Sequence, residues 1–312
     1  MKKSFICLLL ALLCGHISAQ NTHPYELLLS EEDLGNTVSF LADDANTGRA
    51  SGTEGNSRAA QFIVQKFKGS GLNPYNWTYT QSFRYKDSII LRNVAAVLPS
   101  TVPSNEYVII TAHYDHLGEL KGTIYNGADD NASGVASLIA LADMSARIRR
   151  AGGVQRKNLI FVALDGKELS LAGSKYFIKH LNIPAKNITA AINMDILGSN
   201  LVPPGKDSSY ILAIGDDSMP QRYRGSMKYI CQRQECRLDV CMSFYGSRDF
   251  TKMVYENGDH WIFAKAGIPA MFFTSGFHQH TYKSTDDVEI VNLPLLKKRT
   301  LAIFNYINML CR

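Results

Sequence analysis

Histidine, acidic and other polar side chains follow directly after four apolar segments of the sequence. They are His113, Asp115 and His116 after residues 107–111, Asp165, Lys167 and Glu168 after 158–164, Asp195 after 190–194, and His278, His280 and Tyr282 after 270–274. Imidazole nitrogens and carboxylate oxygens are ligands that zinc accepts in proteins. In His113-x-Asp115, the carboxylate can also hold the proton of one ring nitrogen while the other nitrogen binds the metal. The pattern therefore indicates a zinc site, provided that the four segments end at one place.

The elements that must position these groups are predicted from the same pattern. Each of the four segments is a short apolar run, which is typical of a buried strand. Apolar residues at helical spacing predict helices over 56–68, from Ser133 onward, from 174 to 180 and over 295–310. Strands that alternate with helices predict an α/β fold, a three-layer α/β/α sandwich around a mixed, mostly parallel central sheet. In such a sheet ligands bind beyond the carboxyl ends of the strands, so the polar groups are expected to meet there.

Length and composition exclude several classes of protein. The chain has 312 residues, of which 46% are hydrophobic and 20% charged, which excludes a collagen-like, coiled-coil, disordered or polytopic membrane protein. Residues 1–19 combine a basic start, a ten-residue apolar run and a small residue at the end, which predicts a cleavable signal peptide. Residues 20–312 are predicted to form one domain, without a membrane span, that is secreted or periplasmic. Without Lys2 and Lys3 this domain has 31 basic and 28 acidic residues, a net charge of +3 that gives no reason to expect nucleic-acid binding.

The cysteines that remain after removal of the signal peptide are Cys231, Cys236, Cys241 and Cys311. Export to an oxidising compartment favours a local disulfide within the cluster formed by the first three. Cys231–Cys236 is one candidate pair, and the spacing does not choose among the possible pairings.

Six motifs carry a resemblance to a known family. They are GRASGT at 48–53, AHYDHLG at 112–118, NGADDNASG at 126–134, DGKELSLAGS at 165–174, NMDILG at 193–198 and GDHWIF…GIPAMFFTSG at 258–276. With them the chain resembles the co-catalytic zinc exopeptidases of metallopeptidase family twenty-eight, which include bacterial leucyl-type aminopeptidases and, as relatives, glutaminyl cyclases. The resemblance extends over nearly the whole chain after the signal peptide.

The resemblance implies a site with two zinc ions. His113 and Asp195 would hold one ion, and Asp129 would bridge to a second ion held by Glu168 and a late histidine, for which His280 is the candidate. Asp115 would orient His113. The family also implies a cis peptide between Asp129 and Asp130, and a general base that takes a proton from the water between the ions.

The chain departs from this family pattern at two positions. The family has a Glu-Glu pair where this chain has Lys167-Glu168, so that a lysine replaces the general base. Tyr282 stands where the late histidine is expected, and His278 and His280 are out of register. Both changes affect the second zinc position. The hypothesis is that the ammonium of Lys167 replaces the missing cation beside the buried acids.

Three functions are compatible with this pattern. The first is an exported aminopeptidase acting on peptides with attenuated turnover, in which Glu168, Asp115 and Lys167 are the candidate catalytic residues. Asp165 is a possible substitute base, although Asp-Gly is also typical of a turn. The second is an inactive relative that binds peptides or another ligand, and the third is a glutaminyl cyclase-like acyltransferase. Tyr245 and Tyr282 are candidate substrate-binding residues.

Overall fold

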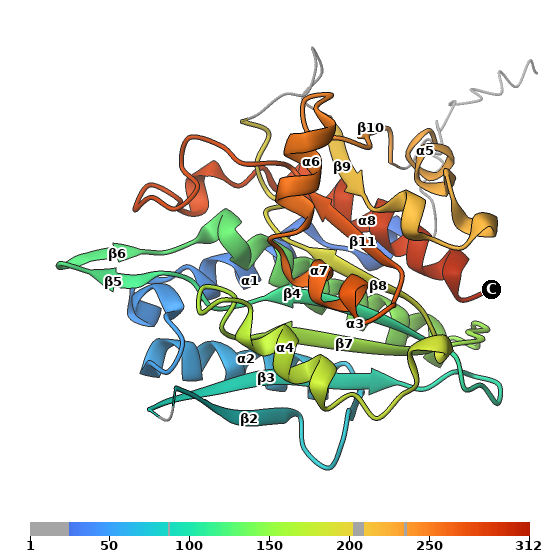
Figure 1. The fold of residues 1–312 in the computed structure, drawn as a ribbon, viewed down its shortest axis with the longest axis horizontal. Coiled ribbons are helices and arrows are strands. Elements are labelled where there is room, and N and C mark those ends of the chain that lie inside the picture. Colours follow the sequence, from blue (N-terminus) through green and yellow to red (C-terminus); the bar gives the residue numbers. More distant parts are fainter. Residues whose placement is uncertain (1–24, 87, 202–208, 234–235) are drawn as a thin grey trace, which may run out of the picture.

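A twisted sheet of nine strands forms the centre of the structure (Figure 1). The computed structural model describes residues 25–312 except 87, 202–208 and 234–235, so the predicted signal peptide lies outside the described residues. The strands of this sheet are β1 (Asn73–Pro74), β2 (Thr80–Tyr85), β3 (Ile89–Leu98), β4 (Tyr107–His113), β7 (Asn158–Leu164), β8 (Ile188–Met194), β9 (Tyr210–Ile214), β10 (Asp239–Cys241) and β11 (Ala270–Thr274). A separate small hairpin consists of β5 (Gly118–Leu120) and β6 (Thr123–Tyr125).

The strand order places the chemically important strand ends beside one another. It runs β1-β3-β7-β4-β8-β11-β9-β10, and β2 pairs with β3. The four central strands β7, β4, β8 and β11 are parallel to their neighbours within this group, whereas the pairs β3–β7 and β11–β9 are antiparallel. The sheet is therefore mixed with a parallel centre, as predicted. Because the central strands are parallel, their carboxyl ends lie at one edge.

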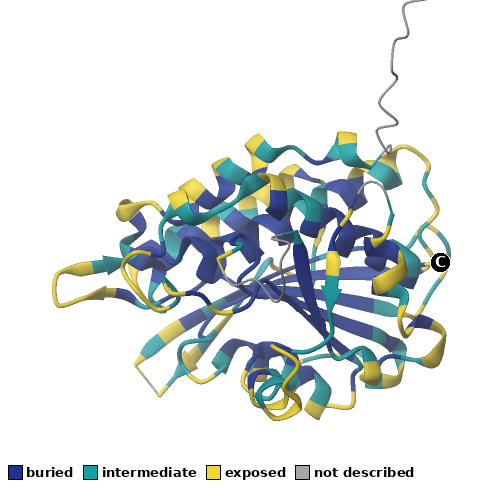
Figure 2. Cartoon of the chain, turned by 90° about the horizontal axis from the view of Figure 1, so that it is seen from above, coloured by how far each residue is buried: buried dark blue, intermediate teal, exposed yellow. Residues whose placement is uncertain are grey.

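Helices cover both faces of the sheet, which gives the three predicted layers (Figure 2). One face packs against α1 (Glu31–Leu41), α2 (Glu54–Gly69), α3 (Ser133–Arg150), α5 (Ser226–Cys231) and α8 (Leu293–Leu310). The other face packs against α4 (Ala172–Lys179) and α7 (Asp259–Lys265), while α6 (Arg248–Tyr255) lies near β9 and β11. Every residue of β7 is buried, which is the reason for its uninterrupted apolar sequence.

The predicted elements agree well with those observed. The strands expected at 158–164 and 270–274 match β7 and β11 residue for residue, and the helix expected at 56–68 is α2. The disulfide candidate Cys231–Cys236 is wrong, because Cys231 is a free thiol buried in the core. Burial raises the pKa of this thiol above its usual value. Among the described residues, no helix is both long enough and apolar enough to span a membrane.

The fully buried guanidinium of Arg49, in the GRASGT motif, joins the loops around the edge of the sheet. It donates hydrogen bonds to the carbonyl oxygens of Tyr114 (2.9 Å), Asn126 (2.6 Å) and Gly127 (2.9 Å). These carbonyls belong to the loop after β4 and to the loop before α3. Arg49 therefore holds in place two loops that carry the candidate ligands.

We expect Arg49→Met to destabilise the protein by at least about 3 kcal/mol, because several buried carbonyl groups would lose their hydrogen-bond donor. The free energy of unfolding from urea titration measures this loss. Arg84→Met, which changes an exposed arginine of β2, serves as the control and should cost less than about 0.5 kcal/mol. Equal losses for both variants would contradict the role given to Arg49.

Candidate metal and active site

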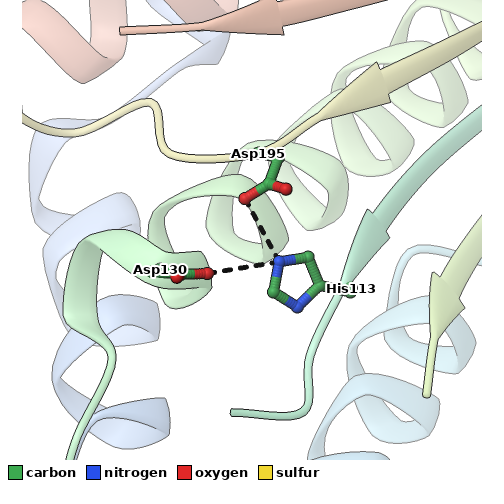
Figure 3. Close-up of side chains that lie close together, drawn as sticks. All are labelled: His113, Asp130 and Asp195. Carbon is green, nitrogen blue, oxygen red and sulfur yellow. Dashed lines mark hydrogen bonds and ion pairs between the residues drawn. The ribbon is translucent and has the colours of Figure 1, made fainter. Parts of the chain in front are cut away.

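Three ligand-type side chains meet at the carboxyl edge of the sheet (Figure 3). His113 is the last residue of β4, Asp195 follows β8, and Asp130 lies in the helical turn Ala128–Ala132 before α3. The Nε2 atom of His113 is 3.2 Å from Oδ1 of Asp195 and 3.3 Å from Oδ1 of Asp130. One ligand atom from each of the three residues lies within 4.8 Å of the others.

These distances fit a zinc ion. A tetrahedral zinc ion with bonds of about 2.0–2.1 Å separates its ligand atoms by roughly 3.3 Å. A single nitrogen and two carboxylates are a usual donor set for such an ion. In addition, Oδ2 of Asp130 is buried without a hydrogen-bond partner among the described residues, which is costly unless a cation is near. The residues present therefore fit one ion at the position of His113, Asp130 and Asp195.

Asp130, and not the expected Asp129, is the aspartate that faces His113. The carboxylate of Asp129 points elsewhere: it accepts hydrogen bonds from the backbone N–H of Gly198 (2.5 Å) and from Ser133 (2.8 Å). Its other oxygen lies 3.2 Å from Nε2 of His278. The cis peptide is likewise one residue later than expected, between Asp130 and Asn131. The motif was thus located correctly, but its register was wrong by one residue.

The loop before α3 is held in place by contacts from distant segments. The side-chain amide of Asn131 donates to the carbonyl oxygens of His113 (3.3 Å) and Met194 (3.0 Å), so it joins the ends of β4 and β8. The carboxylate of Asp286 accepts hydrogen bonds from the backbone N–H groups of Asp129 (2.8 Å) and Asp130 (2.9 Å). Together these contacts decide in which direction each aspartate points.

Asp115 has a different role from the one expected. The ring nitrogen Nδ1 of His113 lies 3.1 Å from the backbone carbonyl oxygen of Asp115 and 3.8 Å from its carboxylate, so the main chain makes the closer orienting contact. The carboxylate of Asp115 instead accepts hydrogen bonds from the backbone N–H groups of Lys167 and Glu168, both at 3.1 Å. Burial and the nearby Asp165 raise its pKa to about 7. Asp115 therefore positions the loop after β7.

The ammonium of Lys167 lies among the acids of the site. Its Nζ is 3.1 Å from Glu168, 3.4 Å from Asp130 and 3.7 Å from Asp195, and the side chain is only 9% exposed. Burial alone would lower the pKa of Lys167, but the three carboxylates outweigh it and raise the pKa well above its usual value. The lysine is therefore protonated and cannot accept a proton from water.

The carboxylates also act on the histidine. Burial and the Lys167 charge lower the pKa of His113, but Asp195 and Asp130 outweigh both and raise it well above its usual value. The pKa of Asp195 is lowered, although burial opposes this, because Lys167 and His113 stabilise its charge.

Asp165, the possible substitute base, is fully engaged in structural contacts. One carboxylate oxygen accepts hydrogen bonds from Ser51 (2.7 Å) and Asn56 (3.1 Å), and the other accepts one from the backbone N–H of Arg92 (2.8 Å). Glu168, the remaining acid of the loop, has its Oε1 paired with Lys167. Asp165 is therefore not available to take a proton from a water molecule in the site.

The late histidine is not part of the ligand groups found among the described residues. Nδ1 of His280 lies 2.8 Å from the hydroxyl of Thr285. The described residues therefore do not bring His280 into a ligand group, and metal binding by His280 stays a prediction. Tyr282 faces the site instead, because its hydroxyl lies 3.4 Å from Nζ of Lys167.

An apolar pocket of about 310 Å³ opens beside this cluster. Lys167, Asp195 and Tyr282 form its polar end, and the rest is lined by Phe250, Met253, Val254, Asn257, Gly258, His260, Phe272 and Phe277. Tyr245, expected to contact substrate, is 53% exposed and does not line this pocket; its ring packs on Phe250. The pocket is assembled mainly from α6, α7, β11 and the segment after β11.

Comparison with known proteins decides the family. The model of Peptidase family M28 matches residues 93–307. The chain belongs to peptidase family M28. Leupeptin-inactivating enzyme 1 of Streptomyces exfoliatus is 28% identical over 244 residues, which cover 77% of this chain and 47% of that protein. The chain spans about half the length of the curated relatives it matches.

Solved structures of M28-like fold confirm the architecture. The LapA aminopeptidase of Legionella pneumophila superposes with a TM-score of 0.71 at 17% identity, covering 92% of this chain and 74% of that one. The glutaminyl cyclase of Porphyromonas gingivalis superposes with a TM-score of 0.65 at 18% identity, covering 90% and 99%. At this level of identity the likeness establishes the fold alone.

Sequence reasoning missed two residues of this M28 site. The sequence analysis took Asp129 as the ligand in place of its neighbour Asp130. Ser133, the first residue of α3, donates a hydrogen bond to Asp129, so that this carboxylate is used in a local contact. His116 was not assigned as a ligand, and it is buried next to Asp130. Its spacing of three residues from His113 was the available signal.

We expect Asp130→Asn to weaken zinc binding by about 100-fold or more, since even residues one layer outside the ligands typically contribute 10–100-fold. Asp129→Asn should leave zinc affinity within a few-fold and instead lower the stability by about 1–3 kcal/mol, because its buried hydrogen bonds weaken. Isothermal titration with zinc and urea unfolding measure the two effects. A larger loss of zinc affinity in Asp129→Asn than in Asp130→Asn would show that Asp129 is the ligand.

Proposed function

We propose that this M28 protein is a zinc-dependent exopeptidase of the aminopeptidase type that removes N-terminal residues from peptides with attenuated turnover. The convergence of His113, Asp130 and Asp195 beside an apolar pocket carries the proposal. An ion held by these three residues would act as a Lewis acid on the scissile carbonyl. Residues 1–19 support the further proposal that the protein is exported.

The pocket suits the side chain of an apolar N-terminal residue. Its apolar lining from α6 and β11 would bury such a side chain, whereas Asp195 and Lys167 lie at the end nearest the candidate ion. A cavity of about 150 Å³ holds benzene, so 310 Å³ is sufficient for a leucine or phenylalanine side chain. Binding there would hold the scissile bond next to His113 and Asp195.

The low turnover that we propose follows from the lack of a side chain in the site that is available as a general base. A general base contributes typically about 10²–10⁴-fold to the rate. The base position holds the protonated Lys167, Glu168 is paired with it, and Asp165 is saturated with hydrogen bonds. Proton removal from water is therefore the step that this site performs poorly.

The test is hydrolysis of leucyl-p-nitroanilide by the purified protein with and without added zinc. We expect slow release of nitroaniline that EDTA abolishes and zinc restores, and no cleavage of the N-acetylated substrate. Lys167→Glu combined with Tyr282→His should raise kcat by about 10²-fold, because it supplies the missing base and the late histidine that the family pattern implies. Lys179→Glu, an exposed change on α4, is the control. No zinc-dependent release from any of these proteins would contradict the proposal.

A second candidate function is peptide binding without turnover, which the ion pairs of Lys167 favour. It predicts calorimetric binding of an apolar tripeptide by a protein that does not cleave it. The glutaminyl cyclase alternative is less well supported, because it needs zinc at the position of Glu168 and the late histidine. That position holds Lys167 and Tyr282 here.

A further inference from the structure

His116 is a buried histidine with no assigned partner beside the candidate ion site. It is 1% exposed, and both of its ring nitrogens lack a hydrogen-bond partner among the described residues. Two unpartnered buried nitrogens are costly, which calls for an explanation.

An unpartnered carboxylate oxygen lies near His116. Nδ1 of His116 lies 3.9 Å from Oδ2 of Asp130, which has no hydrogen-bond partner either. One ligand atom each from His116, Asp130 and Glu168 lies within 4.8 Å of the others. These three residues form a second group of nitrogen and oxygen donors that shares Asp130 with the group of His113 and Asp195.

We propose that His116, Asp130 and Glu168 form a second metal position, and that the ammonium of Lys167 occupies it in place of an ion. The inference rests on the proposed function in so far as it takes the first ion to be held by His113, Asp130 and Asp195. The nitrogen ligand of the second position is then His116, from the loop after β4. The segment after β11 supplies none, because Tyr282 faces the site and His280 contacts Thr285.

Charge balance supports one ion plus one ammonium. Asp130, Glu168 and Asp195 together carry a charge of −3, and the ammonium of Lys167 contacts all three. One dication and one ammonium together carry +3 and balance this charge. Two dications and the ammonium would leave an excess of +2 in a largely buried site. Such an excess is unfavourable at low dielectric. Removal of the ammonium should therefore open the second position to a metal ion.

The experiment counts zinc ions per chain, by isothermal titration and by elemental analysis after gel filtration. We expect one ion in the wild-type protein, two in Lys167→Met, and one in Lys167→Met combined with His116→Phe. Lys179→Met, which removes an exposed lysine of α4, should keep one ion. Lys167→Gln is measured in parallel, so that a folding defect of one variant does not decide the result, and folding is checked by thermal unfolding.

Cobalt supplies a readout that does not depend on activity. In Lys167→Met the second equivalent of Co²⁺ should add visible absorption bands, and loss of the His116 ring should remove them. An unchanged ion count after removal of Lys167 would overturn the proposal, as would a second ion that binds equally well without His116. If the wild type binds no zinc, the proposed function fails, whereas one ion that is gained in Lys167→Met and lost again with His116→Phe would still support the second position.

Discussion

Three acidic side chains at one edge of the sheet, two buried and one partly exposed, require positive charge, and the organisation of the site depends on that requirement. Asp130, Glu168 and Asp195 would be strongly destabilising without a cation. Lys167 contacts all three, and the imidazole of His113 lies against two of them. The lysine therefore stabilises the acids at a position where an ordinary catalytic site of this family would need a base. The side chain at position 167 can either compensate the charge of the acids or act as a general base.

A hydrogen-bonded frame fixes the loops that carry the acids, whichever cation compensates the charge of the acids. Arg49 and Asp286 contact backbone groups of the loops that follow β4 and precede α3, and Asn131 joins the ends of β4 and β8. None of the three is itself one of the candidate metal ligands. The frame can therefore keep the ligand geometry whether an ion or an ammonium compensates the acids, which explains how the cleft persists when the catalytic residues change.

The fold by itself does not decide between the activities found on it. Both an aminopeptidase and a glutaminyl cyclase superpose on most of this chain. The family pattern that the sequence resembles implies other residues in two short segments, the loop after β7 with Lys167 and the loop after β11 with Tyr282. Function therefore has to be argued from these side chains and from the apolar pocket next to them.

The sequence by itself determined the α/β class, the four central strands, the edge at which the site lies, and the proximity of His113, Asp195 and Lys167. These features follow from local periodicity and from the common direction of parallel strands. Only the tertiary structure decided that Asp130 replaces Asp129 and that His116 faces the acids. Adjacent residues of a loop point in different directions, and each direction is set by distant contacts, such as those from Asp286 and Asn131, which no local pattern of residues encodes.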